Sequence, residues 1–383
     1  MTPNLSIVLN LSRWVAAWLV LLSHARHLVL VDLGGVQQAT LLDKGLYFFT
    51  GLGHESVVIF FVISGFLVGG TTLHRWQQHG PNLRSYAIAR FSRIYTVLIP
   101  ALLAGLVLDM VGLRWFNASA LYTDSIRYHT ISLGSNTSAA LDARTFLGNV
   151  LMLQGIWTES FGSNNPLWSL AYEWWYYCIF ALFAAAWTGT GRWRALAAVA
   201  GAAILVGLPM PFLLWGTIWL LGLITYGWTM SRLWRPHPLL GALLLAIAVV
   251  WSRTSHNVNN LDHPESLLTG FTRDLLLGMA YAVALTSVTR MKSTVAFSRF
   301  HARMADVSYS TYLCHFPAML LIVAVVYQEL GTPFQLQPDM RGIAYLGCLV
   351  GVLLVYCTAF AWLTERHTAA VQRRIKTALT RTP

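Results

Sequence analysis

The chain has 383 residues, of which 56% are hydrophobic and 11% charged, and its mean hydropathy is +0.55. Soluble domains are about a quarter charged, so a chain this apolar has too little polar surface to cover a water-facing globule. The formal net charge of +11 would suit a nucleic-acid partner only if the basic side chains formed one face of a soluble domain. They lie instead in short gaps between apolar runs, which argues against nucleic acid and predicts a protein in a lipid bilayer.

Apolar segments suited to membrane spans recur along the whole chain, where a span needs about 20 residues. They predict an all-α polytopic membrane protein of about ten transmembrane helices in one bundle, a single domain over residues 1–383. No Lys or Arg precedes Arg13 and no small-residue cleavage site follows the first segment, so we expect a retained span there. The segments lie at about 8–31, 52–73, 94–113, 167–187, 195–208, 212–230, 238–251, 269–286, 307–328 and 342–364.

The distribution of basic residues predicts the orientation of these spans. Cytoplasmic loops collect Lys and Arg, and most basic residues here fall in the gaps that are cytoplasmic when the N-terminus lies inside. We therefore expect both termini in the cytoplasm, an outer loop at about 114–166 and a cytoplasmic tail at about 365–383. The cysteines (Cys178, Cys314, Cys348 and Cys357) lie in apolar runs without metal-ligand spacing. We expect small buried hydrophobes and no metal.

The first predicted span carries ionisable groups, which are costly in lipid and therefore candidates for function. Arg13 and His24 are eleven residues apart, almost three helical turns, so they share one helix face about 16 Å apart along the axis. The structural alternative has Arg13 reaching the inner interface and His24 satisfied in the core. The shared face favours a functional role.

Glu173 is the second candidate, about two turns into a span that enters from outside and at nearly the depth of His24. A carboxylate beside a histidine can fix its tautomer and stabilise the imidazolium that forms when it takes a proton. The alternative is a structural pair between Glu173 and Arg26.

Two further groups leave their roles open. Arg90 and Arg93 lie three residues apart at the cytoplasmic end of the third span, where they could bind phosphate oxygens or simply follow the positive-inside rule. Mid-span His315, in a motif with Tyr309 and Pro317, could relay protons or contact an acceptor, or could make a structural hydrogen bond at a proline kink.

Ser64 and Trp168 each have two interpretations. The sequence around Ser64 favours a role in close helix packing over a role as nucleophile, because it lacks the Gly-x-Ser-x-Gly elbow. Trp168 could stack on a sugar or belong to an interfacial aromatic belt.

Together these segments resemble the acyltransferase-3 family of integral membrane acyltransferases. Six matching segments appear in the family's order and extend from end to end of the chain. Two positions differ from many members: Val58 and Trp174 stand where an acidic residue is common. Because the chain ends shortly after its last span, we expect a member without the fused outer hydrolase-like domain. The matching segments are Arg13–His24, Phe60–Leu67, Arg90–Tyr95, Pro166–Glu173, Ser308–Pro317 and Thr364–Arg366.

The resemblance implies transfer of an acyl group, commonly acetyl, from cytoplasmic acyl-CoA (acetyl-CoA) to a hydroxyl, often of an envelope or exported polysaccharide, in a bacterial inner membrane. It implies His24 as general base or covalent acyl carrier, with Glu173 orienting it. Arg13, Arg90 and Arg93 would bind the coenzyme. Arg26, Tyr309, His315 and Trp168 are possible substrate or supporting residues.

Other functions stay open at this point. The acceptor could be a lipid or a small secreted metabolite. A transporter or flippase could use the same intramembrane charges, although transporters commonly show repeat symmetry and no matching halves are found here. The partners we expect are acyl-CoA, a saccharide or other hydroxyl acceptor, and membrane lipid, with the oligomeric state undetermined.

Overall fold

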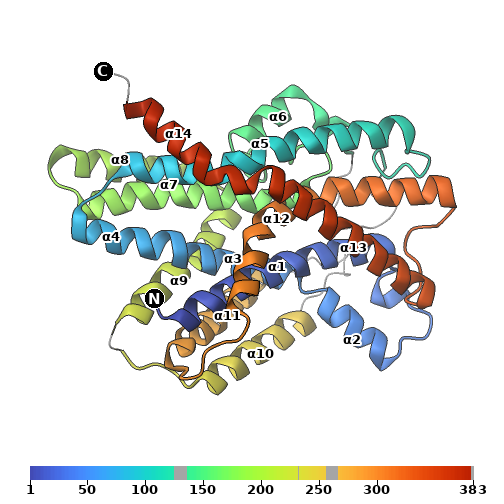
Figure 1. Ribbon diagram of the computed structural model, residues 1–383, viewed down its shortest axis with the longest axis horizontal. Coiled ribbons are helices and arrows are strands. Elements are labelled where there is room, and N and C mark those ends of the chain that lie inside the picture. The colour runs from blue at the N-terminus through green and yellow to red at the C-terminus, as the bar shows by residue number, and fades with distance from the viewer. Residues whose placement is uncertain (125–135, 232, 256–265, 381–383) are drawn as a thin grey trace. The chain divides into compact units, whose positions relative to one another are not determined.

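The computed structural model describes residues 1–124, 136–231, 233–255 and 266–380. Within these ranges the chain forms helices and turns, with two isolated bridges and no β-strand, so the prediction of an all-α protein is confirmed. Residues 125–135 of the predicted outer loop lie outside the described residues. The α-helices (Figure 1) are α1 (Pro3–Val29), α2 (Leu41–Thr50), α3 (Gly53–Ser64), α4 (Thr71–His79), α5 (Leu83–Trp115), α6 (Ala143–Val150), α7 (Trp168–Thr188), α8 (Gly191–Val206), α9 (Met210–Met230), α10 (Pro238–Ser255), α11 (Leu267–Ser287), α12 (Ser298–Leu330), α13 (Met340–Leu363) and α14 (Thr368–Thr380).

Each predicted span corresponds to a helical segment, and the span at 52–73 runs through α3, the π-helical residues 65–70 and the start of α4. In the described part of the chain, eight helical segments are long and apolar enough to cross a membrane on those grounds alone. The predicted spans at 167–187 and 195–208 form α7 and α8, which are not among the eight. The aromatic run Trp174–Tyr177 lowers the hydropathy of α7, and α8 has 16 residues. The helices fit an integral membrane protein.

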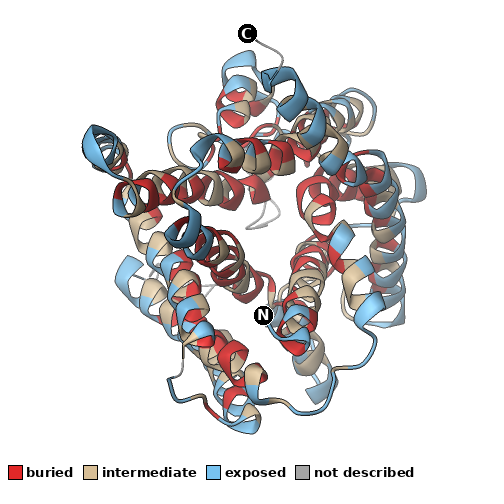
Figure 2. Ribbon diagram, turned by 60° about the vertical axis from the view of Figure 1, so that its left-hand side comes forward, coloured by how far each residue is buried: buried red, intermediate tan, exposed pale blue. Residues whose placement is uncertain are grey.

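The exposed faces of the helices support this conclusion. Figure 2 shows buried and exposed residues on different faces of the helices. On α10 most exposed side chains are apolar, among them Leu239, Leu243 and Ile247, which are 74%, 57% and 55% exposed. Soluble proteins rarely expose contiguous apolar faces of this kind, whereas lipid solvates them. Of the cysteines, Cys314 and Cys357 are buried as expected, Cys178 is half-buried, and Cys348 is exposed.

The chain divides into two compact units. The first holds Met1–Ala16, His54–Ala87 and Tyr172–Ala305, and the second holds Ala17–Gly53, Ile88–Ala171 and Asp306–Pro383. Five of the described helices, α1, α3, α5, α7 and α12, contribute residues to both units, α3 through Gly53 alone.

In the first unit, α9 packs against α11 and against the π-helical segment η2 (Gly65–Gly70) that follows α3. Two glycines allow the close approach. A Cβ atom on Gly65 would overlap the carbonyl oxygen of Trp219, and one on Gly222 would overlap the carbonyl oxygen of Val62. The sequence prediction of close packing around Ser64 therefore has its physical basis in the neighbouring Gly65.

In the second unit, side-chain caps define where several helices begin. Thr40 and Asp43 form a capping box at α2, and Asp142 and Asp339 accept backbone N–H groups at the starts of α6 and α13. Such caps satisfy N–H groups that have no partner within the helix. The pKa of the Asp142 carboxyl lies below its ordinary value because it accepts the Thr145 backbone N–H and hydroxyl.

The glycine contact gives a test of the fold. Gly222→Ala places a methyl group against backbone and should lower stability by about 1–3 kcal/mol. Gly227→Ala, on the same helix with nothing within 4 Å of its Cβ position, should be neutral or raise stability by up to about 1 kcal/mol. Thermal unfolding of the detergent-solubilised variants measures both effects. Equal melting temperatures for the two variants would contradict the contact.

Candidate active site

Two histidines from α1 and α12 meet in the second unit. Nδ1 of His24 lies 2.9 Å from Nε2 of His315, across 291 residues of sequence. The ring planes are parallel within 4° and the ring centroids are 5.2 Å apart. The two distances are compatible only if both nitrogens lie on the line between the ring centroids. Because the ring planes are parallel, the rings then lie edge to edge in one plane, which is the geometry that a linear hydrogen bond prefers. The His315 side chain is fully buried and His24 is half-buried.

The remaining ring nitrogen of His315 faces its own helix. Nδ1 lies 2.8 Å from the carbonyl oxygen of Thr311 and 3.0 Å from that of Tyr312. The neighbouring Phe316 ring packs against His24 at 5.2 Å and nearly perpendicular to it. The imidazole of His315 is therefore held by its own backbone, and the imidazole of His24 is held by two side chains of α12.

The carbonyl that the proline kink frees has a partner other than His315. Pro317 has no N–H, so the carbonyl four residues earlier, on Leu313, loses its partner within the helix. Asn164 donates its Nδ2–H to that carbonyl at 2.8 Å. The Asn164 side chain is buried. His315 is thereby left to contact His24.

The loop before α7 that carries Asn164 is fixed by further buried contacts. Asp109, on α5 and only 1% exposed, accepts hydrogen bonds from the Ser163 backbone N–H at 2.8 Å and hydroxyl at 2.7 Å. The Tyr312 hydroxyl donates to the carbonyl of Pro166 at 2.9 Å and lies 2.5 Å from the Ser169 hydroxyl. The segments 166–169 and 308–317, both singled out in the sequence, thus contact each other.

Glu173 lies in the first unit, at the end of a chain of polar groups. It accepts a hydrogen bond from the Tyr177 hydroxyl. The Ser64 hydroxyl lies 3.0 Å from that of Tyr177 and accepts the indole N–H of Trp219, also at 3.0 Å. Since a carboxylate only accepts, each hydroxyl must donate toward Glu173. The Ser64 hydroxyl therefore has a hydrogen-bond partner on each side, and its lack of a nucleophilic role stays a prediction. His24 belongs to the second unit, so its pairing with Glu173 stays a prediction.

Arg93, predicted to bind phosphate, has a carboxylate partner. Its Nη1 lies 2.7 Å from Oε1 of Glu365, and its guanidinium lies over the Tyr309 ring at 4.9 Å. The other carboxylate oxygen, Oε2, accepts the Ser310 backbone N–H at 3.0 Å and hydroxyl at 2.8 Å. Three segments of the second unit, from α5, from α12 and from the residues after α13, therefore meet at Glu365.

The remaining predicted residues lie on α1, α5 and α7. Arg13 is half-buried on α1 in the first unit, Arg90 is half-buried on α5, and Trp168 is half-buried at the start of α7. Arg26 is 5% exposed and pairs with Asp32 at 3.2 Å, with its guanidinium over the Tyr47 ring at 5.1 Å. The predicted alternative, a pair between Arg26 and Glu173, stays a prediction.

Several buried ionisable groups were not predicted as site residues from the sequence. Asp109 lies within the third predicted span and Asp274 within the eighth. In the first unit, Asp274 lies 2.7 Å from Nε2 of His54, and the 2% exposed Glu55 accepts the Ser252 hydroxyl at 2.9 Å. The signal was present, because an acidic residue in an apolar run is unusual in itself.

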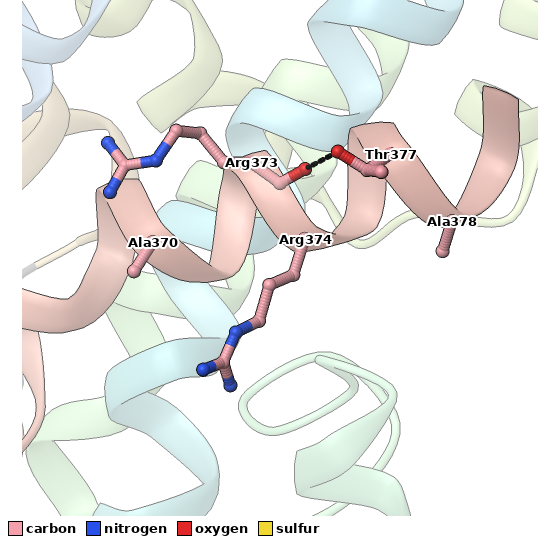
Figure 3. Close-up of a pocket in the computed structure, with 5 residues that line it drawn as sticks. All are labelled: Ala370, Arg373, Arg374, Thr377 and Ala378. Carbon is pink, nitrogen blue, oxygen red and sulfur yellow. Dashed lines mark hydrogen bonds between the residues drawn. The ribbon is translucent and has the colours of Figure 1, made fainter.

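A surface hollow of about 530 Å³ runs along α14, in the predicted cytoplasmic tail. Arg373 and Arg374 line it, and Figure 3 shows their side chains pointing in different directions from the helix. The first unit also contains an apolar cavity of about 500 Å³, lined by aromatic side chains of α7 and α9 such as Tyr176, Phe212 and Trp219. Among the described residues, no group of three or more His, Cys, Asp or Glu side chains is arranged to hold a metal ion.

The fold and site define a helical membrane protein with a hydrogen-bonded histidine pair, and comparison with known proteins gives its family. The family model described as an acyltransferase domain, Acyl_transf_3, matches residues 7–364. The chain therefore belongs to the acyltransferase-3 family, and the resemblance found in the sequence is confirmed.

The chain is also similar over part of its length to a curated protein. An uncharacterised protein of Haemophilus influenzae is 34% identical over 128 residues, which are 32% of this chain and 46% of that protein. The chain thus spans about half the length of this curated relative. No solved structure matches the chain.

The contact between Asn164 and Leu313 gives a sharp test of the site's framework. Asn164→Ala leaves the Leu313 carbonyl buried without a donor and should cost about 1–3 kcal/mol of stability. In a Pro317→Ala background, the restored N–H of residue 317 can bond that carbonyl. We therefore expect Asn164→Ala to cost at least about 1 kcal/mol less there.

The four proteins of this double-mutant cycle, compared by thermal unfolding in the same detergent, give the coupling directly. Additive effects would mean that Asn164 does not replace the hydrogen bond that Pro317 removes.

Proposed function

We propose that this protein transfers an acyl group, acetyl in the simplest case, from cytoplasmic acyl-CoA to a hydroxyl of an envelope or exported glycan. Membership of an acyltransferase family supports the reaction class. The observation that carries the proposal is His24 itself, a half-buried imidazole in an apolar helix, held in plane by His315 at 2.9 Å. An imidazole held in this way is suited to proton transfer.

The reaction balances with one base. His24 takes the proton of the acceptor hydroxyl as its oxygen attacks the thioester carbonyl carbon. The carbon–sulfur bond breaks, and the coenzyme A thiolate leaves and receives the proton from the imidazolium. The products are an ester and free coenzyme A. In the covalent variant, the His24 nitrogen attacks the thioester first and the hydroxyl then attacks the acyl-imidazole. We favour the direct route because it needs no second nucleophile.

The donor and acceptor are proposed to enter from opposite sides. We place the protein in a bacterial inner membrane with both termini on the cytoplasmic side. In that orientation the side where acyl-CoA is available is the side of Arg13, Arg90 and Arg93. Their guanidinium groups suit its phosphates. Trp168 would offer a stacking surface to a sugar acceptor. In this scheme Glu173, fixed by Tyr177, orients or charge-balances His24.

Replacement of the proposed base tests the function. Purified protein in nanodiscs, incubated with radiolabelled acetyl-CoA, should bind it and release free coenzyme A slowly. His24→Ala should lose that turnover by at least ~10²-fold while remaining folded, because it removes the base. Wild-type turnover by the variant would rule out His24 as the base. A folded wild-type protein that neither binds nor turns over acetyl-CoA would favour a transporter or another donor.

Variants of Arg93 and Glu365 distinguish a role of Arg93 in acetyl-CoA binding from a role in stability. Arg93→Ala should weaken acetyl-CoA binding and also lower the melting temperature, because it leaves the buried Glu365 carboxylate without its cation. Removing that carboxylate as well, in Arg93→Ala/Glu365→Ala, should restore much of the melting temperature but not the affinity. Arg90→Ala should also reduce affinity.

Calorimetric titration with acetyl-CoA, together with thermal unfolding, distinguishes these variants. Full recovery of affinity in the double variant would make the role of Arg93 purely structural.

A further inference from the structure

Hydrogen-bonding rules fix where the proton of His315 lies. Its Nδ1 is within 3.0 Å of two backbone carbonyl oxygens, those of Thr311 and Tyr312. A carbonyl oxygen can only accept a hydrogen bond, so Nδ1 must carry the proton and donate. Each carbonyl has two lone pairs, which lets it accept from the ring as well as from its own helix. In the neutral ring, Nε2 then has a lone pair and no proton.

This arrangement in turn fixes His24. Its Nδ1 lies 2.9 Å from the lone pair of His315 Nε2, with both rings in one plane. A hydrogen bond at that distance needs one proton, and only His24 can supply it. Nδ1 of His24 therefore carries the proton, and Nε2 of His24 is left with a free lone pair.

We propose that His315 is a positioning residue that fixes the tautomer of His24 and so makes Nε2 the nitrogen that accepts the proton of the substrate hydroxyl. The inference rests on the proposed function of His24. It assigns to His315 the tautomer-fixing role for which the sequence suggested Glu173. Without such a partner, a neutral histidine side chain carries its proton mainly on Nε2, which would leave that nitrogen unable to act as a base.

The arrangement also supports the charged state. When His24 takes a proton at Nε2, the bond from its Nδ1–H to His315 becomes charge-assisted and shorter. His315 can accept it without moving, because its own Nδ1–H stays bound to the α12 backbone. The perpendicular contact of Phe316 with the His24 ring at 5.2 Å helps to keep the two rings in one plane.

The tautomer can be measured without any enzymatic assay. Protein labelled with ¹⁵N-histidine, in lipid bilayers at mildly alkaline pH, is studied by solid-state NMR, and a His24→Gln sample assigns the His24 signals. We expect a protonated Nδ1 and an unprotonated Nε2 in the wild type. His315→Phe should move the His24 proton to Nε2. His315→Gln, whose amide oxygen can still accept from Nδ1, should keep the wild-type tautomer.

Kinetics provide the second readout. With acetyl-CoA as donor, His315→Phe should lower kcat by at least ~10²-fold, and His315→Gln should stay within about tenfold of the wild type. The KM for acetyl-CoA should be unchanged in both. A wild-type His24 protonated on Nε2, or a His24 tautomer that is the same in the Phe and Gln variants, would overturn the proposal. Because the NMR result does not depend on turnover, an inactive wild type would count against the proposed function alone.

Discussion

Backbone N–H and C=O groups that are shielded from water need hydrogen-bond partners within the protein. The arrangement around the histidine pair depends on this requirement. Pro317 breaks the hydrogen-bond ladder of α12 one turn after Leu313, and the exposed carbonyl must be satisfied. Asn164 satisfies it. The next residue back, Ser163, is held in turn by Asp109. One missing N–H thus determines where the loop before α7 lies, and with it the start of the helix that carries Glu173.

The helices could be predicted from sequence because hydropathy is a property of contiguous segments. Each predicted span corresponds to a helical segment, although α5 and α12 begin well before the apolar stretches that predicted them. Nothing in Arg84, Arg90 or Arg93 stops a helix, so α5 continues through them. Hydropathy marks the part of a helix that suits lipid and is insensitive to the polar turns beyond it.

The site was only partly predictable. His24 and Glu173 stand out because each is an ionisable group in an apolar run. The partner of His24 could not be derived, because helical spacing relates residues on one helix and says nothing of a contact across 291 positions. The motif around His315 drew attention without revealing its role, since a proline kink was an equally good explanation. The structure shows that Asn164, rather than His315, satisfies the carbonyl that the proline frees. The ion pair of Arg93 with Glu365 could not be predicted either, because these two residues are also far apart in sequence.

The backbone contact at Gly65 and Gly222 has a consequence for how the first unit is assembled. Two helices that touch through side chains can slide by small repacking steps, whereas two that touch through bare backbone cannot. A shift of one residue would bring a Cβ atom into the crossing, so only one alignment of η2 with α9 is allowed. Ser64 immediately precedes one glycine, and Trp219 lies three positions before the other. The crossing therefore fixes the Ser64 hydroxyl opposite the Trp219 indole. The hydrogen-bond chain to Glu173 can form in this one register only.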